Sequence, residues 1–80
     1  MAYVTGILSY NMKNDRYGLL VMDLWENDGF HCGECFDIWD YETEQWLPTR
    51  IELNNNGWYL VDTKYRGFDL EGLKVRVKTY

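Results

Sequence analysis

The residues with the most reactive side chains stand together in the segment HCGEC, at positions 31–35. A C-x-x-C pair such as Cys32 and Cys35 can supply two corners of a tetrahedral zinc site, but a closed structural site needs four ligands. The chain has one histidine, His31, and no cysteine besides these two. A zinc site would therefore need carboxylates, or two chains sharing one ion. The ligand count favours a structural turn, and Cys32 and Cys35 remain secondary candidates for a metal site.

Redox chemistry is a less favoured use of the same cysteine pair. In thioredoxin-like proteins the C-x-x-C pair stands at a helix N-terminus, which lowers the pKa of the thiol. Here Cys35 opens the segment CFDIWD at positions 35–40, which alternates as a strand does. The N-terminus lacks the pattern of an export signal, and no apolar run approaches transmembrane length. We therefore expect a cytoplasmic protein with reduced thiols.

Carboxylates are abundant, but their spacing does not predict a catalytic site. Eight of the thirteen acids lie between Asp23 and Glu44, where there is no Lys or Arg. The segment 37–44 could bind a hard cation through oxygens, but it lacks the EF-hand spacing, so a solvated turn is favoured. There is no glycine-rich phosphate loop and no recognisable nucleophile–base set. Eighty residues rarely enclose a cleft that shifts the pKa of a carboxyl group. We expect no enzymatic activity and no cofactor.

The strongest local structure signal is a β-hairpin between positions 46 and 62. The turn cluster Asn54–Gly57 ends in Asn-Gly, a pair that tolerates the positive φ angles of tight hairpin turns. Because side chains alternate along a strand, a loop of two or four residues puts four apolar residues on one face. A three-residue loop would swap the faces. The four residues are Ile51, Leu53, Trp58 and Leu60.

The opposite face of this hairpin is the candidate binding surface. It carries Trp46, Arg50 and Tyr59, which belong to the residue types enriched at binding hot spots. Other strands, or the loop 63–72, could instead cover this face. If it is open, it could take an extended or proline-rich peptide, as SH3-type surfaces do, or stack single-stranded bases.

Charge favours a protein partner over nucleic acid or a membrane. The formal net charge is −5, whereas phosphate backbones and anionic membranes attract basic patches. Five of the eight bases nevertheless lie between Lys64 and Lys78. We therefore expect a non-catalytic protein-binding module, with nucleic-acid binding through the basic C-terminal strand as the alternative.

The elements that must position these residues are short strands. Alternating segments predict strands at 3–10, 16–22, 35–40 and 74–80 beside the central hairpin, with loops at 23–29 and 63–72. Gly6, inside the first strand, indicates a bulge or a close approach of another chain segment. Phe68 and Leu70 could fold back as a plug. The pattern predicts one all-β domain over 1–80, an SH3-like or related antiparallel barrel of about five to six short strands.

Four short sequence words make the chain resemble a family of small proteins of unknown function. They are GILSYN with RYG at positions 6–18, GFHCGE at 29–34, TRIEL with GWYL at 49–60, and LEGLKVR at 70–76. The family is found in low-GC Gram-positive bacteria, often on plasmids, phages and conjugative elements. The resemblance implies a stand-alone cytoplasmic domain and an accessory role in a mobile element. In that setting the acid-rich segment could also imitate phosphate charge toward a host DNA-binding protein.

Overall fold

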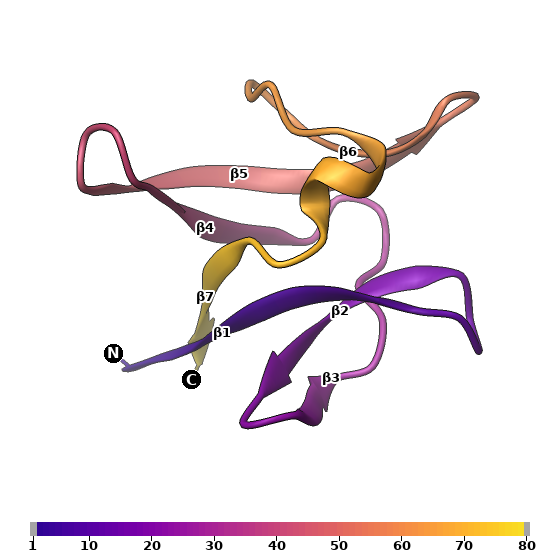
Figure 1. The fold of residues 1–80 in the computed structure, drawn as a ribbon, viewed down its shortest axis with the longest axis horizontal. Helices are drawn as coiled ribbons and strands as arrows, with labels where there is room; N and C mark the ends of the chain where they lie inside the picture. Colours follow the sequence, from indigo (N-terminus) through magenta and orange to yellow (C-terminus); the bar gives the residue numbers. More distant parts are fainter. Residues whose placement is uncertain (1, 80) are drawn as a thin grey trace.

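The computed structural model of the protein describes residues 2–79, which form seven strands with antiparallel pairing and a short 3-10 helix, η1 (Figure 1). The all-β class predicted from the sequence is confirmed. The elements are β1 (Ala2–Asn11), β2 (Arg16–Val21), β3 (Leu24–Asn27), β4 (Cys35–Asp40), β5 (Gln45–Asn54), β6 (Gly57–Leu60), η1 (Gly67–Leu70) and β7 (Lys74–Thr79).

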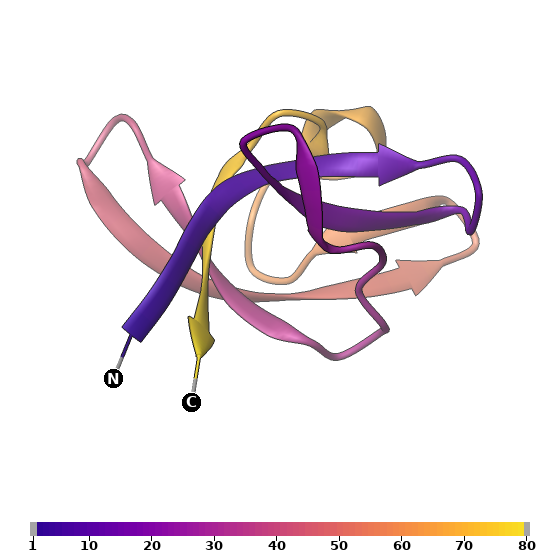
Figure 2. The ribbon, with the colours of Figure 1, turned by 90° about the horizontal axis from the view of Figure 1, so that it is seen from below.

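The strands form one open sheet in the order β3-β2-β1-β7-β4-β5-β6. The last strand in sequence, β7, lies in the middle of this order and joins two halves, β3-β2-β1 and β4-β5-β6, which fold toward each other (Figures 1 and 2). The predicted closure into a barrel is wrong, because β3 and β6 stand at opposite edges of the sheet. The segment after β6 turns back along it instead, through a bridge between Tyr59 and Arg66 and a bond from the Leu60 N–H to the Tyr65 carbonyl.

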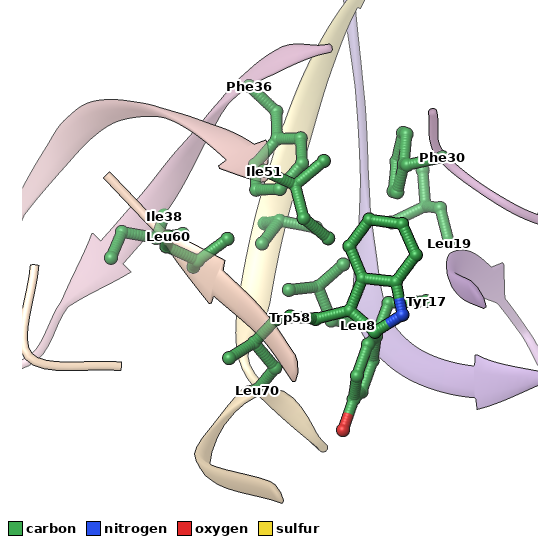
Figure 3. Close-up of a cluster of buried hydrophobic side chains, with 11 residues drawn as sticks. Leu8, Tyr17, Leu19, Phe30, Phe36, Ile38, Ile51, Trp58, Leu60 and Leu70 are labelled. Atoms are coloured by element: carbon green, nitrogen blue, oxygen red, sulfur yellow. The ribbon is translucent and has the colours of Figure 1, made fainter. Parts of the chain in front are cut away.

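The core lies between the two halves of the sheet (Figure 3). Each strand that contributes to it places every second side chain inward, as pleating requires. Trp58 spans the two halves: it comes from β6, and its indole N–H donates to the carbonyl of Asp15 in the β1–β2 turn at 2.9 Å. The buried hydrophobic residues are Leu8, Tyr17, Leu19, Phe30, Phe36, Ile38, Ile51, Trp58, Leu60, Leu70 and Val75.

The central hairpin has the predicted parity. In the register between β5 and β6, Ile51 stands opposite Leu60 and Leu53 opposite Trp58. This is the register expected for the loop at 54–57, and Asn54 and Gly57 form one further pair, so that only Asn55 and Asn56 lie between paired residues. Three of the four predicted core residues are buried, whereas Leu53, beside the turn at the tip of the hairpin, is 52% exposed.

Two segments predicted as loops hold structure of their own. Residues Leu24–Asn27 form β3, which pairs with β2 across a register shift between Leu19 and Leu20. This strand has only four residues and its pairing is irregular. Its side chains therefore show too little alternation of apolar and polar residues to predict a strand. The loop 63–72 contains η1, where Leu70 is fully buried but Phe68 is 91% exposed. Half of the predicted plug is thus confirmed.

Candidate functional site

A cluster of aromatic and basic side chains lies on the outer face of the sheet, opposite the core. At its centre, Trp39 of β4 and Trp46 of β5 form a cross-strand pair with ring centroids 5.2 Å apart in an edge-to-face arrangement. The Lys74 ammonium of β7 lies 5.4 Å from the centroid of Trp39 and 5.8 Å from that of Trp46. Both indoles are half-buried, so part of each ring faces solvent.

Arg76 connects this aromatic pair to the first strand. Its guanidinium carbon lies 4.0 Å from the ring centroid of Tyr3 and 4.7 Å from that of Trp46. Its Nε–H donates to Asp37 Oδ2 at 2.8 Å, and both charged side chains are about three-quarters buried. One side chain therefore contacts residues of β1, β4 and β5. We name the five residues Tyr3, Trp39, Trp46, Lys74 and Arg76 the outer aromatic cluster.

The three binding residues predicted from the hairpin share this outer face but do not form one compact group. Trp46 belongs to the cluster. Arg50 is exposed farther along β5, where its Nε–H donates to Glu52 Oε2 at 3.0 Å. Tyr59 stands opposite Glu52 on β6 and is half-buried. At roughly 3.3 Å per residue, Trp46 and Tyr59 are separated by about 20 Å along the strand. Of the other cluster residues, Trp39 comes from β4, the strand that precedes β5, whereas Tyr3, Lys74 and Arg76 come from strands distant in sequence.

Beside the cluster, β4 and β7 part from each other. Their ladder consists of the pairs Asp37–Arg76 and Ile38–Val75. Beyond these pairs a groove of about 370 Å³ opens, which we name the β4–β7 groove. The ribbon shows β4 and β7 diverging toward the C-terminal end of β7 (Figure 2). Its walls include Tyr3, Cys35, Asp37, Pro48, Arg76 and Lys78.

The segment HCGEC forms an exposed turn before β4. The Glu34 N–H donates to the His31 carbonyl at 3.1 Å, and the Glu34 carboxylate accepts from the His31 N–H at 2.6 Å. Cys32 and Cys35 are free and exposed, and Cys35 Sγ lies 3.6 Å from the Gly33 carbonyl oxygen. Within residues 2–79, no three His, Cys, Asp or Glu side chains gather in a way that could hold a metal ion.

We expect the variant with Cys32→Ser and Cys35→Ser to fold as the parent does, with a free energy of unfolding changed by less than about 0.5 kcal/mol. The reason is that both thiols are exposed and contribute little to packing. Thermal melts and elemental analysis of both proteins provide the measurement. A stoichiometric zinc content in the parent, lost together with the fold on chelation, would contradict the prediction.

Three carboxylates of the acid-rich segment 37–44 have partners, and one of them, the exposed Glu42, lies 3.9 Å from the Lys64 ammonium. Asp37 pairs with Arg76. In the β4–β5 turn, Asp40 accepts from the Thr43 hydroxyl at 2.7 Å and from the Glu42 N–H at 3.1 Å. The hydrogen bond from the Thr43 hydroxyl, followed by that from the Glu42 N–H, lowers the pKa of Asp40. This geometry fits the solvated turn favoured by the sequence.

Comparison with known proteins identifies a family and a relative of known structure. Residues 6–77 match the sequence profile of a family described as "Domain of unknown function (DUF5348)". The crystal structure of a protein from Ruminococcus gnavus, a target of the Northeast Structural Genomics Consortium, is 36% identical in sequence. The similarity covers 92% of this chain and 100% of that one, with a TM-score of 0.77. A comparison with curated proteins finds no match. Among residues 2–79, no helix has the length and apolarity needed to cross a membrane.

Proposed function

We propose that this chain, which belongs to the DUF5348 family of domains of unknown function, is a non-catalytic protein-binding module. Its recognition surface is the outer aromatic cluster, continued along β5 by Arg50 and Tyr59. The observation that carries the proposal is the half-buried pair Trp39–Trp46, held beside Lys74 and Arg76 on the outer face of the sheet.

The composition and rigidity of the cluster support this proposal. Trp, Tyr and Arg are the residues enriched at binding hot spots, where they combine large contact area with directed hydrogen bonds. Arg76 is already fixed by Asp37, Tyr3 and Trp46. A side chain that is held in place before binding loses little conformational entropy when a partner arrives. An extended peptide on such an aromatic surface would resemble recognition by SH3-type domains.

Single-stranded nucleic acid is the second candidate partner, and the position of β7 is what favours it. Basic residues beside aromatic rings are the combination that binds a phosphate backbone and stacks bases. The ion pair with Asp37 offsets the charge of Arg76, however, and the net charge of the chain is −5. Both reduce attraction for a polyanion, so a protein partner is the better supported class.

The setting of this activity is also part of the proposal. The sequence words at 6–18, 29–34, 49–60 and 70–76 resemble small cytoplasmic proteins carried by mobile elements of low-GC Gram-positive bacteria. A binding module without catalysis suits an accessory factor of such an element, acting on a protein of the host cell.

The proposal predicts that Trp46→Ala weakens capture of the partner at least about tenfold, which corresponds to about 1.4 kcal/mol of binding energy. The measurement is capture of proteins from a lysate of the native host by the immobilised chain, followed by titration of what is captured. Phe68→Ala is the matched control, because Phe68 is an aromatic side chain that is 91% exposed on η1. Thermal melts of both variants verify the fold.

Equal capture by the parent and Trp46→Ala would contradict the proposed surface. Binding of an oligonucleotide at low salt that is lost steeply as salt rises would favour the second candidate, because phosphate contacts release counterions.

A further inference from the structure

We propose that the β4–β7 groove binds an extended peptide segment of the partner that carries acidic side chains. This inference rests on the proposed protein-binding function and adds the chemistry of the segment that is recognised. The groove adjoins the outer aromatic cluster, since Tyr3 and Arg76 belong to both.

The backbone around the groove suits an extended chain. In the part of the chain that the structure describes, the ladder between β4 and β7 has no pair at Cys35 or Phe36. On its other side β4 pairs with β5 as far as Cys35, so the groove-facing edge at Cys35 and Phe36 has no ladder partner there. An extended peptide can add main-chain hydrogen bonds at such an edge and place alternate side chains in the groove.

The charge of the groove walls selects acidic side chains. The wall formed by β1 and β7 carries Arg76 and Lys78, together with the ring of Tyr3. The acid in the lining, Asp37, is bonded to Arg76. The exposed Lys78 forms no ion pair with residues 2–79. A carboxylate that enters the groove would thus meet an ammonium group that has no ion-pair partner among residues 2–79, beside a partly neutralised guanidinium.

The rest of the molecule restricts how acidic the segment can be. The chain has a net charge of −5, so each additional negative charge on a ligand increases the electrostatic repulsion between ligand and protein. A polyanion is therefore repelled at long range, whereas one or two carboxylates gain more from the local cations than they lose. This balance favours a peptide with isolated acidic residues over nucleic acid.

The two exposed thiols provide the experiment, because Cys35 lines the groove and Cys32 is absent from its lining. Two variants, Cys32→Ser and Cys35→Ser, each leave one thiol whose rate of reaction with N-ethylmaleimide can be measured. The probe is an acetylated peptide of alternating valine and glutamate at millimolar concentration. We expect it to slow the reaction of Cys35 at least about fivefold and to leave that of Cys32 unchanged.

Charge variants test the role of Lys78. Lys78→Glu should abolish the protection of Cys35, whereas Lys13→Glu, a charge reversal in the β1–β2 turn, should leave it intact. A peptide with glutamine in place of glutamate should protect weakly or not at all. Equal protection by both peptides, equal protection of both thiols, or no protection would overturn the inference. So would protection by oligothymidylate alone, or a loss of Cys35 reactivity with rising protein concentration, which would identify a second copy as the occupant.

These outcomes separate the inference from the function on which it rests. If partner capture depends on Trp46 but the acidic peptide does not protect Cys35, the outer surface is retained and the chemistry assigned to the groove is wrong. If capture does not depend on Trp46 either, the proposed function fails as well.

Discussion

Replacement of Leu60 by alanine is expected to lower the free energy of unfolding by about 2–5 kcal/mol, which is a large part of the total stability of a domain this small. Leu60 is 1% exposed, stands opposite Ile51 in the hairpin and belongs to the buried core, where it lies beside Ile38 (Figure 3). Truncation would leave a cavity between the halves, because strands fixed by their ladders cannot close around it. Thermal melts and urea titrations provide the measurement.

The adjacent Tyr59 is the matched control for Leu60. It lies on the outer face of β6, opposite Glu52, and is half-buried. Tyr59→Ala should cost about 1 kcal/mol or less, within the range of cross-strand pair energies. If Tyr59→Ala were more destabilising than Leu60→Ala, the hairpin register would be wrong by one residue and the two faces of β5 and β6 would be exchanged.

The hairpin shows what local sequence determines. Asn54–Gly57 specifies where the chain turns, and period-two alternation then assigns Ile51, Trp58 and Leu60 to the core without knowledge of any other strand. The same alternation predicted the strand at 35–40, which is β4, and the strand at 74–80, of which residues 74–79 form β7 and Tyr80 lies outside the described residues. The turn and the alternation of side chains along a strand are determined by residues that lie close together in the sequence.

The features that the sequence did not predict depend on strand order. The central place of β7 puts Arg76 between Tyr3, from the other end of the chain, and Trp46. No local pattern marks that meeting, so the sequence indicated Trp46 as a binding candidate without Tyr3 or Arg76. Trp39 is different, because it stands opposite Trp46 in the neighbouring strand β4 and the same local alternation could have found it. The failure of the sheet to close into a barrel also depends on strand order. Closure would require β6 to pair with β3, but the segment returning after β6 bridges it at Tyr59 instead.

Gly6→Ala is expected to destabilise the protein by about 1–3 kcal/mol, because the added methyl group has no room. A Cβ at position 6 would collide with the carbonyl oxygen of Leu20 and would lie 2.9 Å from Leu19 Cδ1 and 3.0 Å from Val21 Cγ2. The two side chains could rotate, but the carbonyl belongs to the β2 backbone and can move only with the strand. The close approach predicted from Gly6 is thereby confirmed.

The steric strain caused by Gly6→Ala would lie at the point in β1 where pairing with β2 begins beside the existing pairing with β7. Residues Ala2–Ile7 of β1 pair with β7, and the ladder with β2 begins at Ile7 and continues to Asn11. Displacing β2 from Gly6 would therefore loosen the joint between the halves of the sheet. Thr5→Ala is the matched control, because Thr5 is exposed in the same strand and its truncation should change stability by less than about 0.5 kcal/mol. Equal melting temperatures for Gly6→Ala and the parent would show that β2 can yield at this point, and that the joint does not depend on the absence of a side chain at position 6.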